Sequence, residues 1–130
     1  MYNNLKIGEF FKMKNNKIDW TKSDQEVVTF INTALTAYTL LDNEKWYIGK
    51  ARVLFPDETF VMVMKIFFPG EVINIDEEGI YVQAGTGMIK ILALQPPGQE
   101  MVSASTFYLS EQRLGLGSWF DRDAFEKTMK

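Results

Sequence analysis

The sequence predicts a mainly β domain with one helix, folded as an OB-like small antiparallel β-barrel. Three observations support this prediction. The chain has 130 residues, a length that suits one hydrophobic core. Aromatic residues make up 14% of the chain, which favours β structure with a well-filled interior. One helical segment is followed by several short apolar runs with turn residues between them, which is typical of a small barrel.

The chain divides into three parts along its length. Residues 1–17 are rich in lysine and have little apolar periodicity, which predicts a basic arm or linker. Residues 18–120 are expected to form the OB-like domain, and Ile18 and Trp20 are expected to dock on its body. Residues 121–130 form a C-terminal tail, which begins with an aspartate and is expected to contain a short helix.

A helix is predicted over residues 24–37. Ser23 and Glu26 have the spacing of a capping box, in which each side chain bonds the backbone of the other. The apolar side chains that recur at helical spacing and define one buried face are Val27, Phe30, Ile31, Leu35 and Tyr38.

Five strands are expected after the helix, with turn signals between them. A turn at residues 41–44 precedes the first strand, because Asp and Asn side chains bond their own backbone. The strands are expected at residues 46–54, 59–68, 71–75, 80–84 and 88–95. Pro96 and Pro97 end the last strand, since proline has no N–H to donate to a ladder. A short helical turn is expected at residues 103–107.

The composition excludes several kinds of chemistry. The chain has no cysteine and no histidine, so thiolate nucleophiles are excluded and the commonest general base and transition-metal ligand are missing. The glycines at Gly85 and Gly87 lack the third glycine and the following helix of a phosphate loop, and are expected to form a hairpin turn. The acidic run at residues 76–78 lacks the spaced oxygen ligands of a calcium loop. We expect no cofactor, no metal site and no catalytic residue.

No segment of the sequence predicts a membrane span or a targeting signal. The longest apolar-rich stretch, residues 60–68, is interrupted by Lys65 and is too short to cross a bilayer. The first residues lack the apolar run of a signal peptide. A cytoplasmic location with no membrane partner is therefore expected.

Four segments, in the right order and spacing, resemble the C-terminal domain of methionyl-tRNA formyltransferases. They are residues 18–23, 69–72, 79–98 and 113–120, and the resemblance covers about residues 17–120. The resemblance implies an OB-like fold that helps to hold the acceptor arm of initiator tRNA. In that family a separate N-terminal domain binds formyl-tetrahydrofolate and catalyses the transfer, and the C-terminal module also occurs in formyltransferase-like proteins that do not act on tRNA.

The sequence departs from the family pattern in two respects. Nothing in it matches the Asn, His and Asp constellation of the catalytic domain, so formyl transfer by this chain alone is not expected. The basic residues that the resemblance implies for tRNA are replaced at residues 98–100 and 31–34. Losing these cations removes phosphate contacts, which supply most of the affinity for nucleic acid.

Three hypotheses follow from the residues and the resemblance together. The first is a non-catalytic substrate-positioning or interaction domain, whose partner is a separate formyltransferase catalytic domain or tRNA. The alternative is an RNA-binding OB module acting alone, with exposed aromatic residues such as Trp46, Tyr47 or Tyr81 as stacking platforms, or a protein-interaction domain that has lost nucleic-acid binding. The third is a small-molecule-binding or enzymatic barrel with a carboxylate site. The sequence specifies no oligomeric state.

The charge distribution selects the candidate nucleic-acid-binding residues. Net charge is −3, with +3 in residues 1–22 and −6 in the remainder, so a basic arm precedes an acidic body. Lys50 and Arg52 have the spacing of one strand face and are expected to meet one phosphate track. The full set of candidates is Lys12, Lys14, Lys17, Lys50, Arg52 and Lys90.

Overall fold

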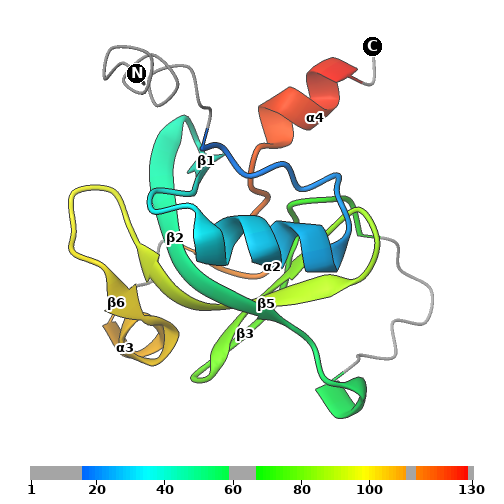
Figure 1. Cartoon of the computed structure of the whole chain (residues 1–130). Helices are drawn as coiled ribbons and strands as arrows, with labels where there is room; N and C mark the ends of the chain where they lie inside the picture. The colour runs from blue at the N-terminus through cyan, green and yellow to red at the C-terminus, as the bar shows by residue number, and fades with distance from the viewer. Residues whose placement is uncertain (1–15, 59–66, 111–113, 129–130) are drawn as a thin grey trace, which may run out of the picture.

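A computed structural model describes residues 16–58, 67–110 and 114–128 of the chain. In these ranges an antiparallel sheet is accompanied by short helices (Figure 1). The strands are β1 (Tyr38–Leu41), β2 (Glu44–Val53), β3 (Val72–Asp76), β4 (Gly79–Gln83), β5 (Met88–Gln95) and β6 (Val102–Ser103). The helices are α2 (Asp24–Thr33), the 3-10 turn η1 (Pro56–Glu58), α3 (Ala104–Ser110) and α4 (Arg122–Thr128).

The start of α2 follows the predicted capping box. Ser23 accepts a hydrogen bond from the Glu26 N–H at 3.2 Å, and Glu26 accepts one from the Ser23 N–H at 3.2 Å. The backbone N–H groups of Ser23 and Glu26, which have no partner within the helix, are thereby satisfied. The helix buries Val27, Val28 and Ile31 against the sheet, and in Figure 1 it crosses β2 and β5.

The predicted end of this helix is wrong. The helix ends at Thr33, because Ala34 has an extended backbone with ψ 134°. Leu35, which we expected on the buried face, is 99% exposed, and Tyr38, expected on the same face, begins β1 instead. The cause is the β1–β2 hairpin. Residues 38–41 pair with residues 44–47 in an antiparallel ladder, so the chain becomes extended before Tyr38. Asp42 and Asn43 form its turn with φ 52° and 68°, a conformation that these two side chains tolerate.

The sheet is open. Its order is β1-β2-β5-β4-β3, with β6 beside β5, and no ladder among the described residues joins β1 to β3. The predicted closure into a barrel is therefore wrong for this part of the chain, and the OB-like assignment is not confirmed. The mainly β character and the antiparallel pairing are as predicted.

A C-terminal segment lies where a closing strand would lie. The Val72 N–H donates to Ser118 O at 2.8 Å, and the Phe120 N–H donates to Gly70 O at 2.8 Å. One residue further on, the Asp121 N–H donates to Leu40 O at 2.8 Å. Residues 118–121 thus satisfy backbone groups at both ends of the sheet, which is the physical reason that β1 and β3 need not pair with each other.

Most of the other predicted elements are present. The strands expected at 46–54, 71–75 and 80–84 are β2, β3 and β4 with bounds shifted by one or two residues, and the strand at 88–95 is β5. The short helices expected at 103–107 and in the tail are α3 and α4. Most of the strand expected at 59–68 lies outside the described residues. The division into an arm at 1–17, a domain at 18–120 and a tail at 121–130 stays a prediction.

Aromatic side chains from distant parts of the sequence form the centre of the core. Trp20 stacks on Phe120 with ring centroids 5.8 Å apart, and Phe120 also meets Trp46 at 6.5 Å. Phe107 of α3 packs edge-on against Trp46 at 5.9 Å. The predicted docking of Ile18 and Trp20 is confirmed, since both are buried. This core therefore joins the segment before α2 to the segment before α4.

Candidate nucleic-acid interface

The structure separates the predicted cations into four groups. Lys12 and Lys14 lie outside the described residues. Lys17 is half-buried, and its Nζ lies 3.5 Å from Asp121 Oδ1. Lys50 is exposed. Arg52 and Lys90 face each other across the ladder between β2 and β5.

Lys50 and Arg52 lie on the same strand but in different surroundings. The ladder is irregular on both sides of Lys50, which pairs with Ala93, and regular pairing resumes at Ala51. Arg52 is half-buried in an ion pair with Glu58, whereas Lys50 is exposed. Their meeting on one phosphate track stays a prediction.

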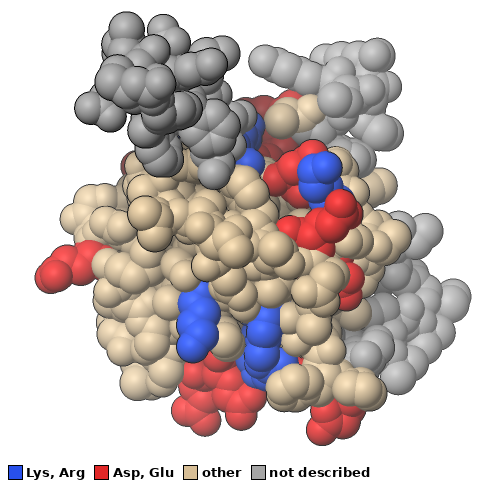
Figure 2. All heavy atoms as spheres, in the orientation of Figure 1, with Lys and Arg blue, Asp and Glu red and all other residues tan. Residues whose placement is uncertain are grey.

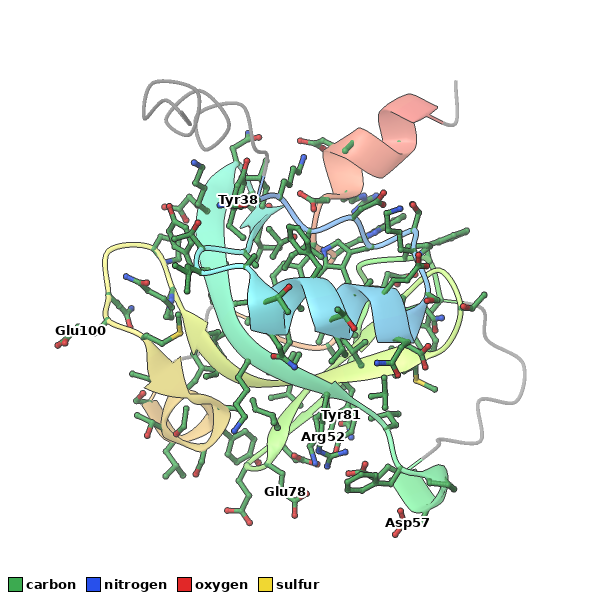
Figure 3. The ribbon with its side chains drawn as sticks, viewed as in Figure 1. Tyr38, Arg52, Asp57, Glu78, Tyr81 and Glu100 are labelled. Atoms are coloured by element: carbon green, nitrogen blue, oxygen red, sulfur yellow. The ribbon has the colours of Figure 1, made fainter. Side chains whose placement is uncertain are left out.

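Arg52, Glu58, Lys90 and Glu78 form an ion-pair cluster that the sequence did not predict. Arg52 donates to both oxygens of Glu58, at 2.6 and 2.8 Å, in the bidentate geometry that guanidinium and carboxylate groups favour. Lys90 Nζ lies 3.1 Å from Glu58 Oε2 and 2.8 Å from Glu78 Oε1. Figure 3 shows Arg52 and Glu78 near each other, together with Tyr81, where β2 leads toward η1. We call these four residues the charge cluster.

Lys90 is 1% exposed, although it is a lysine on a strand. A Cβ at Gly79 would lie 2.6 Å from Lys90 Cγ and 2.8 Å from its Cε, so only glycine leaves room for the Lys90 stem. The Lys90 ammonium lies 5.1 Å from the centre of the Tyr81 ring, which directly faces Lys90 across the β4–β5 ladder. Its charge is thus held by two carboxylates and an aromatic face.

The charge cluster keeps Arg52, Glu58 and Lys90 ionised. Hydrogen bonds from Arg52, then from the Phe55 N–H and Lys90, hold the pKa of Glu58 far below its usual range. Burial by itself would lower the pKa of Lys90, but hydrogen bonds to Glu78, Tyr81 and Glu58 outweigh burial and raise it. The hydrogen bond to Glu58 raises the pKa of Arg52. Each of these shifts moves a pKa away from neutrality, whereas an acid–base catalyst needs one near the working pH.

The aromatic candidates are placed differently from what we expected. Trp46 is 1% exposed and Tyr81 is 4% exposed, so their interpretation as surface stacking platforms is wrong. Trp46 packs against Phe107 and Phe120, and Tyr81 faces Lys90 across the β4–β5 ladder. Tyr47 is half-buried and lies against Tyr38 with centroids 6.1 Å apart.

A surface stack of aromatic rings lies elsewhere, next to the C-terminal segment. Phe68 and Trp119 stack with centroids 5.5 Å apart and an angle of 8° between their planes. Trp119 Nε1 donates to Pro69 O at 3.0 Å, and the Arg122 guanidinium lies 5.1 Å from the centre of the Trp119 ring. Sequence analysis missed this stack, because no local pattern indicates that residues so far apart along the chain will meet.

A cavity of about 230 Å³ lies beside this stack, between β1, the β1–β2 turn and the start of α4. The residues that line it are Lys17, Leu40, Leu41, Asp42, Asn43, Gly117, Ser118, Trp119, Asp121, Arg122, Asp123 and Ala124. Asp121 forms one fixed wall: its Oδ1 accepts from the Leu40 N–H at 3.1 Å, and its Oδ2 accepts from the Thr39 hydroxyl at 2.9 Å.

The described part of the molecule is acidic. It contains eight basic and 15 acidic residues, whereas the rest of the chain contains six basic and two acidic residues. On the face shown in Figure 2, the basic side chains along the lower edge lie next to acidic ones. This face therefore does not present a continuous positive surface to a polyanion.

Two further features of the described residues concern metal binding and membrane spanning. No group of three or more His, Cys, Asp or Glu side chains in these ranges is arranged to hold a metal ion. No helix in the same ranges is long and apolar enough to cross a membrane.

Comparisons with known proteins point to one family. Residues 11–112 match the family described as "Formyl transferase, C-terminal domain". The chain is 32% identical over 105 residues to the methionyl-tRNA formyltransferase of Corynebacterium jeikeium (strain K411), a match that covers 78% of this chain and 30% of that protein. It is 29% identical over 112 residues to the methionyl-tRNA formyltransferase of Mesoplasma florum, covering 83% of this chain and 34% of that protein. The chain thus spans about a third of the length of these relatives.

Proposed function

Since the chain belongs to the formyl transferase C-terminal domain family, we propose that it is a substrate-positioning domain, which holds tRNA for a formyltransferase catalytic domain and does not itself transfer the formyl group. The observation that carries this proposal is the extent of the family match. It covers residues 11–112 of this chain, yet the methionyl-tRNA formyltransferases that it resembles are about three times longer. The matched stretch thus corresponds to about a third of those enzymes, and we assign it a positioning role and not the formyl transfer itself.

The chemistry of the charge cluster supports the non-catalytic part of the proposal. The full sequence has no histidine and no cysteine, so an acid–base residue would have to be a carboxylate, a lysine or a tyrosine. The pKa of Glu58 is lowered and the pKa values of Lys90 and Tyr81 are raised, which keeps all three from exchanging a proton near neutral pH. This cluster holds the sheet together and is not a proton-transfer site.

We propose that phosphate contacts come from Lys50, Lys17 and the two lysines of the arm, Lys12 and Lys14. Lys50 is exposed on β2. Lys17 lines the cavity beside Trp119, and its pair with Asp121 at 3.5 Å is longer than the pairs of Arg52 and Lys90 with Glu58 and Glu78, at 2.6 to 3.1 Å. Arg52 and Lys90 belong to the original set of candidates, but their charges already face Glu58 and Glu78. Their contribution is therefore to hold β2, β5 and η1 in position.

The acidic character of the described residues favours one second candidate. A protein-interaction domain that has lost nucleic-acid binding, with a separate catalytic domain as its partner, would tolerate this charge, whereas tRNA binding must overcome it. The two candidates differ in one measurable property, the affinity of the chain for tRNA.

The test is a titration of the purified chain against fluorescently labelled initiator tRNA, followed by anisotropy at two salt concentrations. Binding in the micromolar range that weakens steeply with salt supports the proposal, because phosphate contacts release counterions. The variant Lys50→Glu should weaken binding, while Lys45→Glu, the same charge reversal on the same strand beside the Tyr38 ring, is the matched control. Absence of binding at low salt would rule out the tRNA role and leave the protein-interaction candidate.

A further inference from the structure

The cavity beside Trp119 combines features that suit a flat, polar ligand. Trp119 lines it and is held in one plane by its hydrogen bond to Pro69 O at 3.0 Å and by its stack on Phe68 at 5.5 Å. Arg122 also lines the cavity and presents a second flat group, 5.1 Å from the Trp119 ring. RNA-binding proteins stack unpaired bases on aromatic rings and on Arg guanidinium planes.

The size and polarity of the cavity limit the ligand further. Its volume of about 230 Å³ is below the range of roughly 300–1,000 Å³ that holds drug-sized ligands, so it suits a single base or a ligand of similar size. The exposed carboxylates of Asp42 and Asp123 lie on its wall. A carboxylate accepts hydrogen bonds from the exocyclic amino group of cytosine or adenine, and uracil has no such group.

We propose that this cavity binds one unpaired nucleobase that carries an exocyclic amino group, with the base stacked on the Arg122 guanidinium that lies over the Trp119 ring and its amino group directed to Asp42 or Asp123. The inference rests on the proposed function, and it names the part of the RNA that the domain recognises. Asp121 has a different role: its bonds to Thr39 and Leu40 fix the wall of the cavity. Lys17, which pairs with Asp121, lies at the rim where the phosphate of the bound nucleotide would pass.

The chain contains its own reporter for this site. Of its three tryptophans, Trp20 and Trp46 are buried and Trp119 is partly exposed. A base that stacks beside Trp119 quenches its fluorescence, so a change in emission on ligand binding reports this ring. The experiment is a titration of the full chain with CMP, AMP and UMP at fixed ionic strength.

CMP and AMP should quench the emission saturably, with dissociation constants in the millimolar range, and UMP should bind at least about fivefold more weakly. Arg122→Ala should weaken CMP binding severalfold. Arg122→Lys should weaken it similarly, because lysine keeps the charge but loses the plane. Equal quenching by UMP, a linear response without saturation, or full CMP affinity in Arg122→Lys would overturn the proposal.

The same reporter separates this inference from the proposed function. Labelled initiator tRNA could bind with strong salt dependence while Trp119 emission stays unchanged and Arg122→Ala binds tRNA as tightly as the unmodified chain. In that case the cavity is not the base site and the tRNA role stands. If tRNA does not bind while CMP still quenches in preference to UMP, the cavity binds nucleotides and the tRNA role fails.

Discussion

The Asn32 side chain pairs with the backbone of Ala51 as a neighbouring strand would. Its Nδ2 donates to Ala51 O at 2.8 Å, and the Ala51 N–H donates to its Oδ1 at 3.1 Å. The β1 ladder reaches only as far as Tyr47, so this edge of β2 would otherwise lack a partner at Ala51. A helix side chain thus completes the sheet edge and fixes the position of α2 on β2.

Replacing Asn32 should therefore destabilise the fold. We expect Asn32→Ala to lower the free energy of unfolding by about 1–3 kcal/mol, because it leaves two backbone groups of Ala51 without their partners. Thr29→Ala, an exposed position on the same helix, is the control and should change stability by less than about 0.5 kcal/mol. Urea unfolding followed by circular dichroism measures both, and equal midpoints for the two variants would contradict the role of Asn32.

Gly79 should not accept a side chain. In Gly79→Ala the new Cβ meets Lys90 Cγ at 2.6 Å and the backbone oxygen of Ile91 at 2.9 Å, so either the lysine or the strand must move. We expect a loss of about 1–3 kcal/mol in the free energy of unfolding. Gly115→Ala is the matched control, since nothing lies within 4 Å of its Cβ position. A Gly79→Ala variant as stable as Gly115→Ala would show that Lys90 does not occupy this space.

The two carboxylates that contact Lys90 should contribute unequally. Glu58 is largely buried and also holds Arg52, so Glu58→Gln should destabilise the fold by about 2–4 kcal/mol. The side chain of Glu78 is 73% exposed, and solvent screens its pair with Lys90, so Glu78→Gln should lose under about 1 kcal/mol.

A double-mutant cycle between Glu58 and Lys90 measures their coupling directly. With Glu58→Gln, Lys90→Met and the double variant, we expect a coupling of about 1–3 kcal/mol in chemical denaturation. Additive losses would mean that the two groups do not stabilise each other, despite the 3.1 Å distance between them.

Stability should depend on acid through Glu58. Its pKa is lowered from the ordinary value of 4.5 by Arg52, so its contribution is fully present above pH 4.5 and is lost as the pH falls below that value toward the folded-state pKa. The pKa of Lys90 is raised from 10.5, so the contribution of Lys90 persists below that pH and is lost only as the pH rises above it.

Urea midpoints measured from about pH 7 down to about pH 3 check the acid limb. The midpoint of the unmodified chain should fall over the lower part of this range, and that of Glu58→Gln should fall less. Parallel curves for the two proteins would show that another carboxylate controls acid unfolding.

The features that could be predicted from the sequence depend on neighbouring residues. The capping box at Ser23 and Glu26, the bounds of β5 and the turn at Asp42 and Asn43 each follow from a short pattern whose physical cause is local. The hydrogen bonds of the capping box and of the turn join residues close together in the chain, so one stretch of sequence contains both partners. The end of β5 follows from the two prolines directly after it. The family resemblance also came from such stretches, and the match over residues 11–112 confirms it.

Long-range pairing decided the rest. The sequence predicts that the helix runs to residue 37 with Tyr38 on its apolar spacing, but Tyr38 begins β1, which pairs with β2. Lys90 is a basic strand residue by sequence, and only Gly79, Glu58 and Glu78, brought to it by the fold, explain why it is buried.

The candidate site shows the same division. The sequence alone determined the mainly β fold, the start of α2, most of the strands and the family. Only the tertiary structure decided which cations are exposed, how the C-terminal segment joins the two edges of the sheet, and that Phe68 meets Trp119 beside a cavity. The physical reason is that local patterns record the preferences of neighbouring residues, whereas burial and ion pairing depend on residues that the fold brings together from distant parts of the chain.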